Sequence, residues 1–172
     1  MKRALLSLAL IAGLAAAPAL AAPAPKVTSV ATLKDLPTPL PLPYDEAADA
    51  RTVNARLDAA IAQARRSHRL LLVDLGGNWC PDCRLLAAVM RLPEVKAFVD
   101  QHYVVLPVDI GRRDKNLQVP HRFGLDKIGG VPSLIVVDRK GRIVDDGHVE
   151  ALADARSMTP QALADWLAQW TN

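Results

Sequence analysis

A short apolar run limits most strongly what this chain can fold into. Residues 70–73 read Leu-Leu-Leu-Val, with an arginine before the run and an aspartate after it. A continuous apolar run of this length is typical of a strand buried on both faces, which occurs where helices cover both sides of a sheet. Gly76 and Gly77 follow, and residues 85–90 then show helical spacing. The run therefore predicts an α/β fold with a central buried strand.

The flanking segments supply the other elements of such a fold. Helical spacing predicts helices over residues 45–66 and 80–91, and prolines at 93 and 160 begin two more. We expect strands at residues 103–109, 133–137 and 142–144, the last two joined by a glycine-containing turn. Residues 110–130 are polar and irregular, with a short helix near residues 120–123. This order predicts an α/β sandwich in which helices flank a central mixed sheet.

The first residues indicate export. Lys2 and Arg3 precede an apolar run that ends in small residues around Ala21. This pattern is typical of a cleavable secretory signal peptide, which we expect to span residues 1–21 and to direct the protein to a bacterial periplasm. Residues 22–43 are rich in Pro and Ala and cannot form a regular helix. We expect them to be an extended leader before a single domain at residues 44–172.

The charge balance excludes two classes of partner. The chain has 21 Lys and Arg against 18 Asp and Glu, and removal of Lys2 and Arg3 leaves 19 basic residues. A chain this close to neutrality has no excess charge that favours nucleic acid or an anionic membrane. We expect neither partner, and we expect a monomer.

The chain has two cysteines, Cys80 and Cys83, separated by Pro81 and Asp82. A disulfide between them closes almost no loop, so it would contribute little stability, and the spacing favours chemistry. Cys80 stands where a helix begins, and the helix dipole there lowers the pKa of a thiol. We expect Cys80 to be the nucleophile that attacks a disulfide and Cys83, one turn later, to resolve the mixed disulfide.

Asp74 follows the apolar run and is expected to be buried. A buried carboxyl has a raised pKa, so Asp74 is a candidate to move a proton to or from Cys83. The alternative is a solvent-facing carboxylate at the end of a strand.

From Leu70 to the C-terminus the chain resembles the thioredoxin superfamily. The resemblance rests on Trp79-Cys-Pro-Asp-Cys83 after Val73-Asp74, and on Gly129-Gly-Val-Pro132 about fifty residues later. It implies a three-layer thioredoxin-like sandwich and a thiol-disulfide oxidoreductase. It also implies that Pro132 is cis, that Val131 and Pro132 present a main-chain edge to an extended substrate, and that Trp79 flanks the nucleophile on an exposed surface.

Several positions depart from thioredoxin itself. Pro81-Asp82 stands where thioredoxin usually has Gly-Pro, Gly76 replaces a tryptophan, and the next strand lacks a lysine near the aspartate. The break at Leu92-Pro93 is more like the thioredoxin-like domains of exported thiol relay proteins. The resemblance therefore implies a divergent periplasmic relative.

Pro81 and Asp82 are expected to tune the redox potential. A negative charge at Asp82 repels a thiolate at Cys80 and raises its pKa, which favours the reducing direction. We expect a disulfide reductase or isomerase-type relay that acts on exported proteins with disulfides. In an oxidising compartment such a protein needs an electron source, for which a membrane thiol relay is the candidate.

Two alternatives remain open at this point. A thioredoxin-like protein with two cysteines and one histidine could deliver copper, and a binding module could use the docking edge without turnover. The histidines (His68, His102, His121, His148) show no ligand spacing, so we expect no metal. We expect no cofactor other than the redox-active Cys80–Cys83 disulfide.

Overall fold

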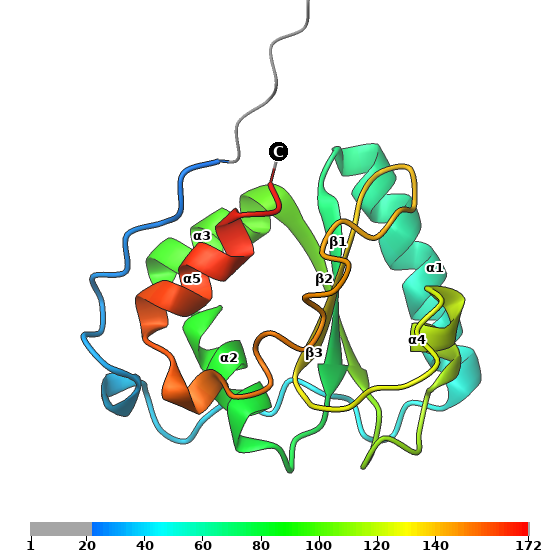
Figure 1. Cartoon of the computed structure of the whole chain (residues 1–172), viewed down its shortest axis with the longest axis horizontal. Coiled ribbons are helices and arrows are strands. Elements are labelled where there is room, and N and C mark those ends of the chain that lie inside the picture. The colour runs from blue at the N-terminus through cyan, green and yellow to red at the C-terminus, as the bar shows by residue number, and fades with distance from the viewer. Residues whose placement is uncertain (1–21, 172) are drawn as a thin grey trace, which may run out of the picture.

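A computed structural model describes residues 22–171, so the predicted signal peptide lies outside the described residues. At its centre is a mixed sheet of three strands in the order β2-β1-β3 (Figure 1). β1 (Leu70–Gly76) runs parallel to β2 (Tyr103–Asp109) and antiparallel to β3 (Ser133–Val137). The predicted α/β sandwich around a mixed sheet is confirmed.

Helices cover both faces of this sheet. α1 (Ala50–Ser67) and α4 (Gln118–Arg122) lie on one side, while α2 (Pro81–Val89), α3 (Pro93–His102) and α5 (Pro160–Ala168) lie on the other (Figure 1). α1 begins five residues later than residue 45 because the carboxylate of Asp49 caps it, accepting the N–H of Thr52. No helix within residues 22–171 has the length and apolar character needed to cross a membrane.

β1 is central because its side chains are apolar on both faces. Leu71, Val73 and Leu75 pack with α1, and Leu72 packs with α2, α3 and α5. Because side chains alternate along a strand, Asp74 lies on the same face as Leu72, under α2 and α3. The strand thus carries its carboxylate into the side of the core that borders the cysteines.

The prediction of a strand at residues 142–144 is wrong. This segment forms only a single β-bridge, between Ile143 and Val137. The buried carboxylate of Asp145 accepts the N–H of Val136 at 2.9 Å, in the place where a strand would offer a backbone carbonyl. The chain therefore leaves the sheet after one residue pair and continues through residues 145–154 to a short helix, η2 (Ala155–Ser157).

Residues 22–44, called the N-terminal arm below, are extended apart from one short 3-10 helix, η1 (Leu33–Asp35), and lie along the outside of α3 and α5 (Figure 1). Val27, Leu36 and Leu40 pack against the core on that side. The carboxylate of Glu94 accepts the N–H groups of Thr28 and Ser29. The arm is thus bound along its length and ends beside the cysteines.

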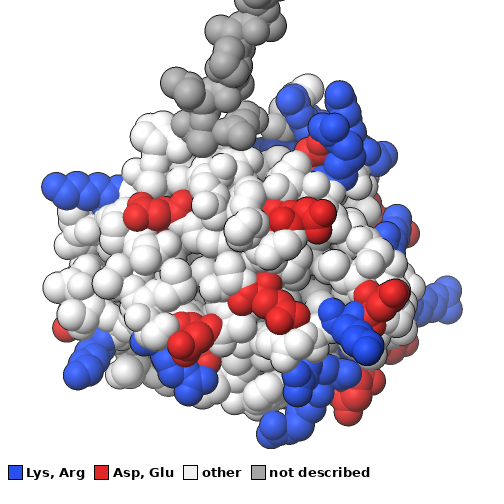
Figure 2. Space-filling model, viewed as in Figure 1, with Lys and Arg blue, Asp and Glu red and all other residues white. Residues whose placement is uncertain are grey.

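Figure 2 shows Lys and Arg side chains mainly around the rim of the face seen in Figure 1, with Asp and Glu side chains between them.

Candidate functional site

The cysteines lie where β1 turns into α2. Cys80 is the N-cap of α2, and its N–H donates to the carbonyl of Gly77 at 3.0 Å. The turn comes so close to its surroundings that a Cβ at Gly76 would lie 2.3 Å from the hydroxyl of Tyr44 and 2.8 Å from Cys83 Sγ. Glycine at position 76 therefore leaves the space that these two side chains fill.

The two thiols interact within the first turn of α2. The N–H of Cys83 donates to Cys80 Sγ at 3.2 Å. The hydrogen bond with the Cys83 side chain is the main cause that lowers the pKa of Cys80 to about 7, and the same bond, together with burial, raises the pKa of Cys83. Of the two, Cys80 is therefore the sulfur that ionises near neutral pH.

Asp74 is 1% exposed, as its place in the sequence predicts, and its charge is one of the causes that raise the pKa of Cys83. Burial raises the pKa of Asp74 to about 7, against the smaller and opposite effect of a hydrogen bond from Tyr44. The Tyr44 hydroxyl donates to Asp74 Oδ1 at 2.8 Å, and Oδ2 has no partner among the described residues. The structure thus places a carboxyl with a pKa of about 7 where its charge acts on the Cys83 thiol.

The sequence predicted that Asp82 acts on Cys80 as an unpaired negative charge, but the structure pairs it with a cation. Asp82 is 1% exposed, and Arg156 of η2 donates Nε at 2.9 Å to Oδ1 and its backbone N–H at 2.8 Å to the same oxygen. Asp82 still raises the pKa of Cys80, but only as a minor influence. The cation offsets the repulsion on which the prediction of a reducing protein partly rested.

The peptide bond between Val131 and Pro132 is cis, as the resemblance implied. The Cys80 thiol donates to the carbonyl of Val131 at 3.5 Å, so this segment borders the more acidic of the two cysteines. The preceding glycines allow a close approach, because a Cβ at Gly130 would lie 2.8 Å from Ala153 Cβ. Residues 145–157 thus support both the Val131 segment and, through Arg156, the first turn of α2.

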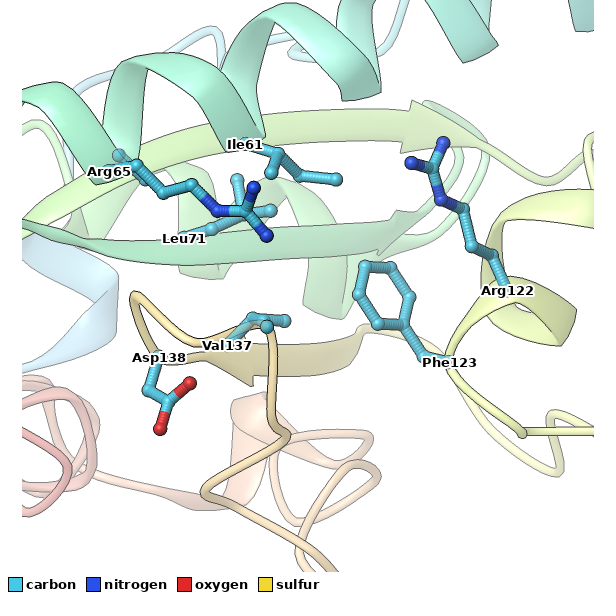
Figure 3. A pocket seen from close by; sticks show the side chains of 9 residues that line it. Ile61, Arg65, Leu71, Arg122, Phe123, Val137 and Asp138 are labelled. Atoms are coloured by element: carbon cyan, nitrogen blue, oxygen red, sulfur yellow. The ribbon is translucent and has the colours of Figure 1, made fainter.

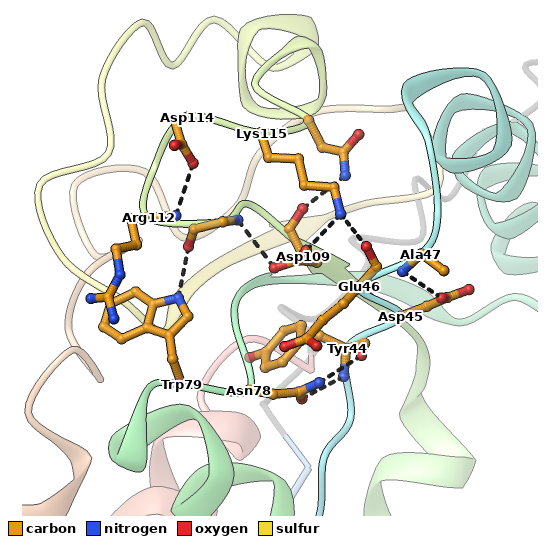
Figure 4. Close-up of polar contacts among 12 residues, drawn as sticks. Tyr44, Asp45, Glu46, Ala47, Asn78, Trp79, Asp109, Arg112, Asp114 and Lys115 are labelled. Atoms are coloured by element: carbon orange, nitrogen blue, oxygen red, sulfur yellow. Dashed lines mark hydrogen bonds and ion pairs between the residues drawn. The ribbon is translucent and has the colours of Figure 1, made fainter.

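Trp79 is 43% exposed beside Cys80, as the resemblance implied. Figure 4 shows its ring against the loop that follows β2: its Nε1 donates to the carbonyl of Gly111 at 2.8 Å, and Arg112 lies over the ring at 4.5 Å. Asn116 holds that loop by donating to the carbonyl of Asp109 at 2.8 Å. The result is an exposed aromatic and cationic platform next to the cysteines.

Two residues that the sequence did not assign to the site lie far from the cysteines in the chain and hydrogen-bond the two buried carboxylates beside them. Tyr44 follows the proline-rich stretch with no periodic pattern around it, and Arg156 lies between residue 144 and Pro160, where the sequence predicted no helix or strand. Neither position carries a signal that would assign it to the site. Asn78, which binds the backbone of Tyr44, was detectable only as a neighbour of the cysteines.

The structure also has a pocket that lies away from the cysteines. A pocket of about 230 Å³ between α1, α4 and the sheet is lined by Ile61, Leu71, Phe123 and Val137, with Arg65 and Arg122 at its rim (Figure 3). It borders the start of β1, at the opposite end of the strand from the cysteines. Within residues 22–171, no three His, Cys, Asp or Glu side chains are grouped so that they could hold a metal ion.

Comparison with known proteins places this geometry in a family. A family model described as thioredoxin-like matches residues 52–139. A disulphide isomerase from Xylella fastidiosa Temecula1, known from its crystal structure, is 34% identical to this chain in sequence. The two structures superpose with a TM-score of 0.69, over 77% of this chain and 99% of that one. A thioredoxin from Halobacterium salinarum NRC-1 is 21% identical, with a TM-score of 0.43, over 75% of this chain and 89% of that one. No curated protein sequence matches significantly. With its Cys80–Cys83 pair, the chain belongs to the thioredoxin-like family.

Proposed function

We propose that this protein is a periplasmic thiol-disulfide oxidoreductase of the reductase or isomerase type that acts through Cys80 and Cys83. The observation that carries the proposal is the position of Cys80 Sγ, which accepts the N–H of Cys83 and lies beside the carbonyl of Val131. A nucleophilic sulfur beside an extended main-chain segment suits attack on a disulfide in a polypeptide. A relative named a disulphide isomerase supports the same class of reaction.

In the first step the Cys80 thiolate attacks one sulfur of the substrate disulfide. The substrate S–S bond breaks, a bond forms between that sulfur and Cys80 Sγ, and the second substrate sulfur leaves as a thiolate that water protonates. Because the pKa of Cys80 is about 7, a substantial fraction of the thiol is ionised at neutral pH. Val131 and Pro132 bind the substrate main chain, and Trp79 covers the adjoining side.

In the second step Cys83 gives its proton to the Asp74 carboxylate and attacks Cys80 Sγ. The Cys80–Cys83 disulfide forms, the mixed disulfide breaks, and the remaining substrate sulfur leaves as a thiolate. The substrate has gained two electrons and the protein has lost two. Asp74 then returns its proton to solvent.

The reducing direction is supported by the acidity of Cys80. Thioredoxin has a nucleophilic thiol with a pKa of about 7, while the strong oxidant DsbA has one near 3.5. The pKa of Cys80 is about 7 and thus resembles that of the reductant. In the periplasm the oxidised protein needs an external donor, for which we propose a membrane thiol relay, and its substrates are exported proteins with disulfides.

Two measurements test the proposal. The equilibrium potential of the Cys80–Cys83 pair, measured in dithiothreitol buffers, is expected near the thioredoxin value of about −270 mV, and a value near −120 mV would make the protein a disulfide donor. Cys83→Ser is expected to trap exported proteins through Cys80 in periplasmic extracts. Cys80→Ser is the matched control, and equal capture by both variants would overturn the enzymatic assignment.

A further inference from the structure

Tyr44, at the end of the N-terminal arm, completes the environment of the resolving thiol. Its side chain is 4% exposed and packs with Cys80 and Cys83 in one cluster. Its hydroxyl donates to Asp74 Oδ1 at 2.8 Å and lies, like Cys83 Sγ, against Gly76. A residue outside the match to the family model, which begins at residue 52, thus contacts the proposed proton acceptor.

We propose that Tyr44 is a positioning residue that occupies Asp74 Oδ1, orients the carboxyl, and leaves Oδ2 to take the proton of Cys83. The inference rests on the proposed function, in which Cys83 must lose a proton before it attacks Cys80. A tyrosine hydroxyl carries one proton and can donate to one carboxylate oxygen at a time. With Oδ1 accepting that bond, Oδ2 is the oxygen without a partner among residues 22–171.

The domain holds Tyr44 through the segment that carries the cysteines. The side chain of Asn78 accepts the N–H of Tyr44 at 3.1 Å and donates to its carbonyl at 2.9 Å, a pair that Figure 4 shows. Arg84 donates to the carbonyl of Leu40 at 3.0 Å and to that of Pro41 at 3.3 Å. Because Asn78 and Arg84 flank the cysteines, the arm is anchored to the active-site turn itself.

The hydroxyl remains a donor throughout the reaction. Burial, reinforced by the charge of Asp74, raises the pKa of Tyr44 above its ordinary value. When Cys83 transfers its proton, Oδ2 becomes the hydroxyl of the acid while Oδ1 continues to accept from Tyr44. A hydrogen bond to a carboxylate stabilises the charged form more than the acid, so Tyr44 keeps Asp74 ionised to lower pH than burial alone would allow.

Other titratable and charged groups also face Asp74. The charge of Asp74 acts on Cys83 of α2, where it is one of the causes that raise the pKa of the thiol. Among the described residues, no titratable side chain on β2 or β3 lines the cavity beside Asp74. Asp74 borders this cavity, which has a volume of about 170 Å³, and shares it with three charged side chains that belong to α3 or precede it: Arg91, Lys96 and Asp100. Tyr44 is the group with a hydrogen bond to the carboxyl, and its removal is therefore the specific test.

The test uses Ellman's reagent and two stopped-flow phases. Attack of Cys80 on the reagent releases one thionitrobenzoate in a first phase, and attack of Cys83 on the mixed disulfide releases another in a second phase. Thionitrobenzoate leaves without protonation, so its own ionisation does not affect the second phase. The pH midpoint of this phase therefore reports the ionisation of Asp74, which must be charged to accept the proton of Cys83. Tyr44→Phe is expected to raise this midpoint by about one pH unit. The loss of a hydrogen bond to a charged group changes the free energy of ionisation by about the amount that corresponds to one unit of pKa.

Tyr103→Phe is the matched control. Tyr103 is the other tyrosine of the chain, is buried, and donates its hydroxyl to the carbonyl of Leu167 at the end of the sheet away from the cysteines. It is expected to lose stability without any change in the midpoint. If Tyr44→Phe also leaves the midpoint unchanged, Tyr44 is a packing residue only and the inference is overturned.

A second variant keeps the test valid if Tyr44→Phe does not fold. Fluorotyrosine incorporated into Tyr103→Phe enters only at position 44, and its more acidic hydroxyl is expected to move the midpoint to lower pH. No movement would contradict the role of Tyr44. Absence of any second phase in the native protein would instead contradict the proposed function, so the two failures are distinguishable.

Discussion

The end of β1 and the first turn of α2 each bury a carboxylate beside the cysteines, and the two regions treat it differently. Asp74, at the end of β1, has the neutral hydroxyl of Tyr44 as its partner, and its pKa is raised to about 7. Asp82, in α2, has the guanidinium of Arg156. A buried acid that lacks a cation can exchange a proton near neutral pH, whereas one paired with a cation acts as a fixed, balanced charge.

The largest effect is expected from Asp74→Asn, which removes the carboxylate that accepts the proton of Cys83 and nearly keeps the shape of the side chain. The second thionitrobenzoate phase should slow by about 10²-fold at neutral pH, a typical contribution of a general base. The first phase should keep its rate, since Cys80 attacks without help from Asp74. A second phase of native rate would show that Cys83 loses its proton by another route.

The same substitution should alter how stability depends on pH. A carboxyl whose pKa is raised to about 7 in the folded state contributes stability that is fully present below its unfolded value of 3.8 and is lost as the pH rises through 7. Relative to Asp74→Asn, the native protein should lose at most roughly 4 kcal/mol between pH 4 and pH 8. Urea unfolding at several pH values measures this, and parallel curves for both proteins would contradict a raised pKa.

Arg156→Gln should leave Asp82, in the first turn of α2, as a buried carboxylate without its cationic partner. Asp82 would then repel the Cys80 thiolate without compensation, so the pKa of Cys80 should rise and the potential should become more reducing. Thiol alkylation as a function of pH measures the pKa. The double variant Asp82→Asn/Arg156→Gln should return close to the native value, and failure to do so would place the effect of Arg156 elsewhere.

The smallest effect is expected from Asp82→Asn alone. Asp82 raises the pKa of Cys80 only as a minor cause, and Arg156 already offsets its charge. The pKa of Cys80 should fall by less than about one pH unit, because Arg156 would then act on the thiolate alone. The same alkylation assay measures this change, and a rise would reverse the sign assigned to Asp82.

The part of the site that sequence reasoning predicted is the local part. Residues 70–83 carry a strand, a turn, a helix start and both cysteines, and each follows from short-range pattern and spacing. The burial of Asp74 was predictable because its neighbours on the strand are apolar. The residues that decide the electrostatics were not predictable, because Tyr44 reaches Asp74 across 30 positions and Arg156 reaches Asp82 across 74.

The error at residues 142–144 has the same physical origin. Ile143 and Val144 have the composition of a strand, and the turn before them is correct. Asp145, which is buried, ends the pairing by placing its carboxylate where the strand would need a carbonyl. Local propensity could not reveal that competition.

The amino-acid sequence by itself determined the α/β architecture, the dithiol at the start of α2 and the glycines that let the chain approach it closely, because these depend on hydrophobic periodicity and on residue spacing. The tertiary structure decided which buried carboxylate can exchange a proton and which is balanced by a cation. That choice depends on the groups that the N-terminal arm and η2 bring within hydrogen-bonding distance, and the electrostatic energy of a buried acid depends on those few contacts more than on its neighbours in the chain.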